Sequence, residues 1–116
     1  MSSTAPARGD VWYADLNPTR GHEQAGKRPV LIVSVNQFNQ GPSGLVIVIP
    51  ISSKDKRVRS QVPIEAGEGG LKSRSFAKCE AVRSISVDRL GGRRQGSVTA
   101  ETLNAVADCL RLLLDL

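Results

Sequence analysis

Gly-His-Glu-Gln-Ala-Gly-Lys-Arg-Pro-Val-Leu-Ile-Val, residues 21–33, joins a polar loop to a run of apolar residues. The loop part, residues 21–29, combines a carboxylate, an imidazole, an amide and two cations with two glycines. The four residues after Pro29 are typical of a buried strand. Proteins often present functional side chains on a polar loop that is held by a rigid strand. This stretch is therefore the first candidate site.

Three interpretations of the loop compete. Gly21, Gly26 and Lys27 match the spacing of a phosphate-binding G-x-x-x-x-G-K loop, but Arg28 stands where that motif needs Ser or Thr. The residues that follow predict a strand, so no helix N-terminus is present to meet phosphates, and we reject this interpretation. The loop is then either a solvated hairpin connection or a site for a nucleic-acid backbone with Arg28 as the phosphate ligand.

The apolar pattern of the whole chain predicts many short strands and one terminal helix. Strands are expected at residues 8–16, 30–35, 45–51 and 61–65, and then either two strands or one bent strand over 75–86. Helical turns are expected around Phe38 and at residues 87–90, and the glycine-rich segment 91–96 is interpreted as the end of the β region. Thr99 is the expected N-cap of a helix. The apolar stripe of that helix comprises Leu103, Val106, Ala107, Leu110, Leu113 and Leu114. Such an order indicates a mainly β (α+β) fold, a small barrel closed on one side by the helix.

Length and composition indicate one small globular domain. The chain has 116 residues, 40% of them hydrophobic and 23% charged, and we expect a disordered tail at residues 1–7 and a single domain at 8–116. No apolar run approaches the roughly 20 residues of a membrane span, and the N-terminus lacks the pattern of a signal peptide. Two cysteines without C-x-x-C spacing and one histidine predict no metal site and free thiols in a reducing cytoplasm.

The net charge of +5 is unevenly distributed along the chain. Lys54, Lys56, Arg57 and Arg59 fall in one short polar segment that contains a single acidic residue, Asp55. A basic loop of this kind suits a polyanionic partner, although a solvated face would have the same composition. Aromatic residues make up only 3% of the chain, which argues against a broad stacking platform for single strands.

Residues 9–18, Gly-Asp-Val-Trp-Tyr-Ala-Asp-Leu-Asn-Pro, together with Gly21-x-Glu23-Gln24-Ala25-Gly26-x-Arg28-Pro29, form a pattern that can be matched. With residues 48–53, residues 80–85 and the terminal helix, it resembles the MazF/PemK family of toxin endoribonucleases over residues 8–116. The resemblance implies an SH3-like barrel with added helices, usually a homodimer. It also implies cleavage of single-stranded RNA without a cofactor, and neutralisation by an antitoxin similar to MazE.

The resemblance also implies roles for individual residues. Arg28 takes the place of a catalytic arginine, and Ser52 the place of a catalytic threonine. Glu23 matches a glutamate used at or near the site, where it would act as a base or orient Arg28. His22 stands where relatives have small polar residues, so it is expected to touch substrate or solvent. The residues expected to bind substrate are Gln24, Lys27, Ser53, Lys54, Lys56, Arg57 and Arg83.

The match to the family leaves one question of register, one departure from the family pattern and two alternative functions open. Ser53 replaces Ser52 if the match is off by one residue, and Ala81 stands where the family has glutamine. The main alternative function is a non-catalytic toxin similar to CcdB, which binds and inhibits a topoisomerase. A peptide-binding barrel is the other, but its groove would need more clustered aromatic residues than this chain has.

Overall fold

The computed structural model describes residues 5–16 and 26–116 of the chain. This part contains a seven-stranded sheet, two α-helices and three short 3-10 helices. The strands are β1 (Asp10–Asp15), β2 (Lys27–Ile32), β3 (Leu45–Ser52), β4 (Gln61–Ile64), β5 (Ser75–Lys78), β6 (Arg83–Ser86) and β7 (Leu90–Ser97). The helices are α1 (Asn36–Asn39), α2 (Ala100–Leu114), η1 (Glu68–Gly70), η2 (Cys79–Ala81) and η3 (Val87–Arg89).

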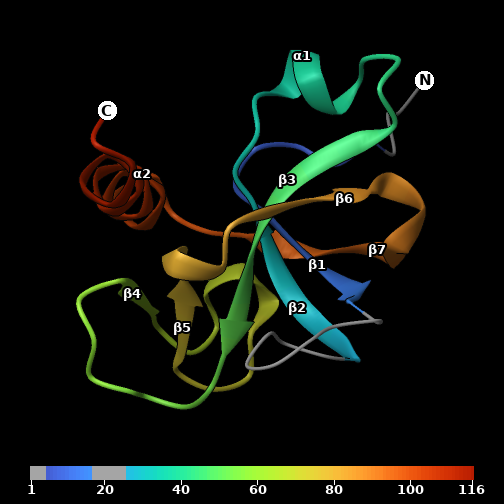
Figure 1. Ribbon diagram of the computed structural model, residues 1–116. Coiled ribbons are helices and arrows are strands. Elements are labelled where there is room, and N and C mark those ends of the chain that lie inside the picture. The colour runs from blue at the N-terminus through green and yellow to red at the C-terminus, as the bar shows by residue number, and fades with distance from the viewer. Residues whose placement is uncertain (1–4, 17–25) are drawn as a thin grey trace.

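The strands pair antiparallel in the order β4-β5-β3-β2-β1-β7, and β6 pairs with the first half of β3 (Figure 1). β3 is the central element, because its later residues leave β2 and pair with β5. In the described residues β4 and β7 do not pair with each other, so strand pairing leaves the sheet open, and η1 packs against β7 instead. The predicted mainly β fold with a C-terminal helix is confirmed.

Alternation along the central strands buries both faces of the sheet. One face carries Val11, Leu31 and Ile49, which are cross-strand neighbours in a cluster that α2 covers through Val106. The other face carries a second cluster. Its members are Trp12, Ala14, Leu16, Val30, Ile32, Val46, Val48 and Ile85. A strand that is buried on both sides is apolar at successive positions, which is why residues 30–33 read as a continuous apolar run.

Helix α2 begins as the sequence predicts and ends differently. The Thr99 hydroxyl accepts a hydrogen bond from the Thr102 backbone N–H at 3.1 Å, so Thr99 is the N-cap. Val106 is buried and Leu110 packs against the core, but Leu113 and Leu114 are 47% and 54% exposed. The predicted apolar stripe therefore covers the β core only along its first part.

The interpretation of residues 91–96 as the end of the β region is wrong. These residues lie within β7, which pairs with β1. The cross-strand pairs run from Asp10 with Ser97 to Ala14 with Leu90, and the register shifts once between Val11 and Tyr13. Gly96 is small because η1 passes directly over it: a Cβ there would lie 2.6 Å from the Gly69 carbonyl carbon. Glycine in a strand often marks such a close backbone approach, and a pattern search reads the same residues as a turn.

The chain between β4 and β7 resolves another open point. Residues 75–86 form two strands, β5 and β6, separated by the 3-10 turn η2.

β2 begins at Lys27, three residues earlier than the strand expected at residue 30, and ends at Ile32. Arg28 therefore belongs to a strand rather than to the loop that precedes it.

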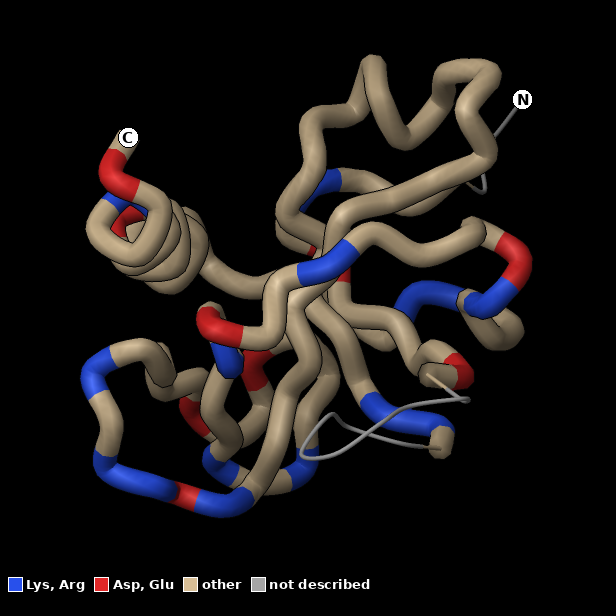
Figure 2. Tube along the Cα trace, in the orientation of Figure 1, with Lys and Arg blue, Asp and Glu red and all other residues tan. Residues whose placement is uncertain are grey.

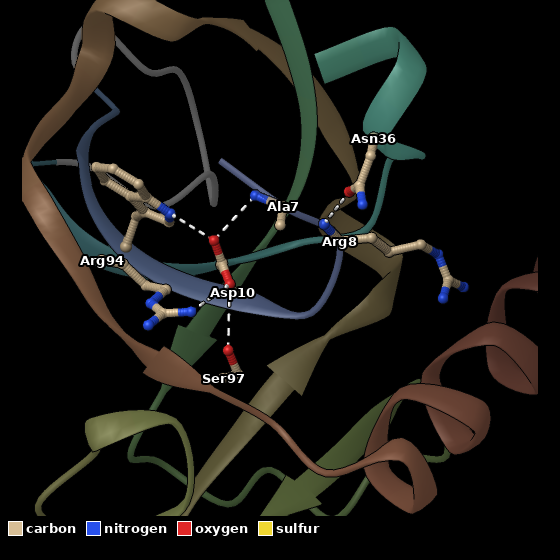
Figure 3. A network of polar contacts seen from close by, with 7 residues as sticks. Ala7, Arg8, Asp10, Asn36, Arg94 and Ser97 are labelled. Atoms are coloured by element: carbon tan, nitrogen blue, oxygen red, sulfur yellow. Dashed lines mark hydrogen bonds and ion pairs between the residues drawn. The ribbon is translucent and has the colours of Figure 1, made fainter. Parts of the chain in front are cut away.

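Asp10, at the start of β1, connects the N-terminal segment to β7 (Figure 3). Its carboxylate accepts hydrogen bonds from Ala7 N at 2.9 Å, Trp12 Nε1 at 3.3 Å and Ser97 Oγ at 3.1 Å. Arg94 Nη1 lies 3.6 Å from Asp10 Oδ1 and forms an ion pair with it. Asp10 itself is only 4% exposed. A buried carboxylate needs such partners, and this set holds the first and last strands together.

The expected tail at residues 1–7 lies partly outside the described residues. Within it the structure places Pro6 at a buried position, and the Ala7 amide makes the bond to Asp10. In the described part of the chain, no helix is long and apolar enough to cross a membrane.

Candidate active site

Arg28 lies on β2, where that strand emerges from the candidate loop. Its cross-strand partner on β1 is Ala14, and Lys27 lies opposite Asp15. The two ends of the loop are joined, since Leu16 N donates a hydrogen bond to Gly26 O at 3.0 Å. Arg28 is exposed at this end of the strand. Its main chain is held in place by the antiparallel pairing of β2 with β1.

Ser52 is the last residue of β3, and Phe76 of β5 lies opposite it. Its Oγ accepts a hydrogen bond from Lys54 N at 3.1 Å, which is the local turn bond that a serine at a strand end often makes. No described residue accepts a hydrogen bond from the Ser52 hydroxyl. Ser53 is more exposed and lies beyond the strand.

Three of the predicted site residues lie on one face of the sheet. Val30 pairs with Pro50, and Val48 pairs with Arg83, so these four residues share the face of the Trp12 cluster. Arg28 is two residues from Val30 and Ser52 is two residues from Pro50, which returns both side chains to this same face. The register therefore brings Arg28, Ser52 and Arg83 to one side of the sheet, from three strands.

A groove of about 680 Å³ lies beside this face. Its apolar wall includes Leu16, Pro50 and Val82, and predicted substrate-binding residues Lys56 and Arg83 line it. Arg28 and Ser52 are not in the lining, but Ser52 follows two residues after Pro50. The groove thus leads from the candidate catalytic positions toward β6 and η2.

Lys27 lines a different groove, of about 590 Å³, between the ends of β1 and β2 and the start of β7. Two arginines that the sequence reasoning did not single out, Arg89 and Arg93, line it together with Tyr13. Arg89 donates a hydrogen bond to Asp15 O at 3.2 Å. Because Lys27 precedes Arg28 on the strand, its side chain faces away from that of Arg28.

Lys54, Lys56 and Arg57 are exposed on the segment between β3 and β4. Figure 2 shows this segment as the longest run of basic residues at the end of the molecule where β3 terminates. Asp55 Oδ1 accepts a hydrogen bond from Arg57 N at 2.8 Å, so the one acidic residue shapes the turn. The described geometry leaves these cations facing solvent beside the groove that Lys56 lines.

Glu23 and Gln24, and with them His22, lie outside the described residues, so their predicted roles remain predictions. In the described ranges no three histidine, cysteine or acidic side chains are grouped in a way that would hold a metal ion. Burial in the core and a hydrogen bond with the Cys109 thiol raise the pKa of Cys79 to about 12. Cys79 therefore stays a neutral thiol and is not a candidate nucleophile.

The sequence reasoning missed Lys78, Gln61 and Glu80, which also line the larger groove. Lys78 lies on β5 directly opposite Gln61 on β4. Nothing in the spacing of these residues marks them, because their proximity depends on how β3 switches partners. The one available signal was a lysine within a strand whose other residues are all compatible with burial.

A sequence model of the family described as "PemK-like, MazF-like toxin of type II toxin-antitoxin system" matches residues 7–114. The chain belongs to this family. Endoribonuclease MazF9 of Mycobacterium tuberculosis is 36% identical to this toxin in an alignment 114 residues long, which covers 94% of this chain and 96% of that protein.

The fold of this toxin agrees with the solved structures of the family. The crystal structure of MazF from Deinococcus radiodurans superposes with a TM-score of 0.86 at 26% identity, covering 98% of this chain and all of that one. The MazF chain in a MazE–MazF crystal structure from the same organism superposes with a TM-score of 0.80 at 27% identity, covering 98% and 99%. These comparisons do not support the CcdB-like alternative.

Proposed function

We propose that this toxin is an endoribonuclease that cuts single-stranded RNA without a metal ion, by attack of the RNA's own 2′-hydroxyl on the adjacent phosphorus. The products are a 2′,3′-cyclic phosphate and a 5′-hydroxyl. Family membership over residues 7–114 supports the nuclease assignment. The observation that carries the mechanism is the placement of Arg28 and Ser52 on one face, at the same end of neighbouring strands.

Each residue suits one task of that reaction. Negative charge builds on the non-bridging phosphate oxygens as the 2′-oxygen attacks, and a guanidinium can bind two such oxygens at once. Arg28 therefore stabilises the transition state. The Ser52 hydroxyl donates a hydrogen bond to the same phosphate, while its own oxygen is fixed by the Lys54 amide. A metal is not required to activate water, because the nucleophile is part of the substrate.

Glu23 completes the set as the carboxylate that takes the 2′-proton or orients Arg28, with Gln24 as a neighbouring contact to the RNA. The binding surface consists of Lys27, Ser53, Lys54, Lys56, Arg57 and Arg83. Arginine itself scarcely deprotonates, so Arg28 is assigned charge stabilisation rather than proton transfer.

The biological unit of the proposal is a homodimer of a domain that spans residues 8–116 and acts in the cytoplasm. Its partner is an antitoxin similar to MazE, since the Deinococcus radiodurans MazF has been crystallised with MazE.

The experiment that tests this function is cleavage of a long RNA by purified toxin in EDTA, followed by analysis of the ends. Cleavage should persist, and the 3′ ends should resist direct ligation until the cyclic phosphate is removed. Arg28→Ala is the matched inactive control, prepared in the same way to exclude a contaminating nuclease. Strict dependence on added magnesium, or 3′-hydroxyl ends, would overturn the mechanism.

A further inference from the structure

Lys78 is buried in the strand β5, with only 8% of its surface exposed, yet it lines the 680 Å³ groove. A lysine side chain is rarely buried in a protein unless it is paired with an anion. In the described part of the chain, Lys78 forms neither an ion pair nor a hydrogen bond to another side chain. A cation held in this way, in a groove rather than at the surface, is poised for an anion that the described residues do not supply.

The nitrogen of Lys78 itself reaches the groove. Among the described residues, the one fully buried side-chain nitrogen or oxygen without a partner is Gln61 Oε1. Lys78 Nζ also has no partner among the described residues, but it is not one of these fully buried atoms. The nitrogen therefore contacts solvent, while the aliphatic part of the side chain is covered. The groove it enters is lined by two more cations, Lys56 and Arg83, and neither has an ion pair within the described residues.

Register places Lys78 close to the candidate catalytic serine. Ser52 lies opposite Phe76, and Lys78 follows Phe76 by two residues on β5, which returns its side chain to the same face. Two residues of a strand span about 6.6 Å. Lys78 therefore sits on the face that carries Ser52, one step farther into the groove.

Gln61 supplies a second, independent feature at the same place. Its Nε2 donates to Glu80 Oε2 at 3.5 Å, which orients the amide so that Oε1 is the buried atom without a partner. Gln61 is the direct cross-strand neighbour of Lys78. A buried acceptor left without a donor is unfavourable unless a ligand supplies the donor.

We infer that this groove is a nucleotide subsite of the RNA substrate, in which Lys78 binds the phosphate next to the scissile one and Gln61 accepts a hydrogen bond from the base or ribose. The inference rests on the proposed nuclease function. The apolar wall of Leu16, Pro50 and Val82 gives the base a surface to lie against. A volume of 680 Å³ suits a small ligand or one nucleotide better than a protein segment.

The test separates binding from chemistry. Affinity for a random-sequence, 2′-O-methylated RNA, which cannot be cleaved, is measured by fluorescence anisotropy between about 50 and 200 mM salt. Each phosphate contact to a single strand contributes about 0.7 to the slope of log affinity against log salt. Lys78→Met should lower that slope by about 0.7 and weaken binding about tenfold at low salt. The single-turnover cleavage rate at saturating toxin should fall less than the affinity does, because most of the contact is already formed in the ground state.

Two further variants make the result specific. Lys72→Met removes the same charge from an exposed lysine outside the groove and should leave the slope unchanged. Lys78→Arg keeps the charge and should retain the slope. Lys78→Met should keep the fold, because the flexible apolar side chain of methionine suits the covered surroundings of residue 78. Equal slopes for wild type and Lys78→Met would overturn the inference, as would an equal loss in Lys72→Met.

The design also distinguishes RNA from an acidic segment of the antitoxin. If Lys78→Met weakens antitoxin binding while the RNA slope is unchanged, the groove belongs to the antitoxin and the inference is wrong. A wild-type toxin that cleaves no RNA would contradict the proposed function itself, which is a different outcome from a cleaving toxin whose Lys78 variant binds normally.

Discussion

Arg28 in β2 and Ser52 in β3 each lie two residues beyond the Val30–Pro50 pair, at the end where the two strands separate (Figure 1). Up to Pro50, β3 pairs with β2, and from Ile51 it pairs with β5. Neither Arg28 nor Ser52 belongs to the β2–β3 ladder, which ends at the Val30–Pro50 pair. In the proposed mechanism both residues contact the scissile phosphate, Arg28 through its guanidinium and Ser52 through its hydroxyl.

Arg28→Ala should reduce the cleavage rate by roughly 10²–10³-fold, the loss expected when one donor to a developing anion is removed. Arg28→Lys should restore little, because an ammonium cannot reproduce a two-pronged contact with phosphate. The measurement is the single-turnover cleavage rate of each variant. Circular dichroism should show an unchanged fold, since Arg28 is exposed. An active Arg28→Ala toxin alongside an inactive His22→Ala toxin would assign the chemistry to the imidazole instead.

Ser52→Ala should slow cleavage more than Ser53→Ala. Ser52 belongs to the β3 ladder opposite Phe76, whereas Ser53 is exposed beyond it. One neutral hydrogen bond to the transition state is worth about tenfold in rate. Ser52→Thr should retain activity, because it keeps the hydroxyl and restricts its rotamers. The opposite order of the two alanine variants would show that the match to the family is displaced by one residue.

Local sequence predicted the elements of this fold better than their contacts. The strands predicted at residues 8–16 and 45–51 and the cap at Thr99 depend on neighbours in the chain, and these predictions are confirmed by β1, β3 and the start of α2. β7 was missed because its glycines read as a turn. One of them, Gly96, is instead required by the close approach of η1, which lies about 26 residues away in the sequence and leaves no local signal.

The candidate site divides in the same way. Arg28 and Ser52 were found because each stands in a motif, but their common face follows from the register of three strands. Lys78 carries no motif, and its burial becomes apparent only when β4, β5 and η2 are assembled around the groove. Its one signal in the sequence is its place in a strand whose other residues are all compatible with burial.

Gly96→Ala should destabilise the protein by about 1–3 kcal/mol, as overpacking typically does. The added methyl would lie 2.6 Å from the Gly69 carbonyl carbon and 2.7 Å from Gly70 N, and neither backbone atom can move without displacing η1. Gly91→Ala, on the same strand, is the control: its methyl would approach Tyr13 O no closer than 3.7 Å. Urea unfolding should separate the two variants, and equal stabilities would mean that η1 does not press on β7.

Glu68 connects η1 to the start of α2, and its contribution should depend on pH. Its carboxylate accepts hydrogen bonds from Thr99 N at 2.9 Å and Thr99 Oγ1 at 3.2 Å. Burial raises the pKa of Glu68, but hydrogen bonds from Thr102 and Thr99 outweigh it, so the pKa lies below its ordinary value of 4.5. A carboxyl whose pKa is lowered by folding stabilises the protein above the unfolded pKa, and the stabilisation is lost as pH falls through the folded value.

Glu68→Gln should therefore unfold at lower urea concentration than the wild type at neutral pH, and the difference should shrink as the pH is brought below about 4. The effect should remain a fraction of the total stability, because the carboxylate is partly exposed and solvent screens it. Glu65→Gln is the matched control, since Glu65 forms only an exposed ion pair with Arg74 at 3.1 Å. A difference between Glu68→Gln and wild type that stays constant from neutral to acidic pH would show that the carboxylate's charge is not what holds η1 to α2.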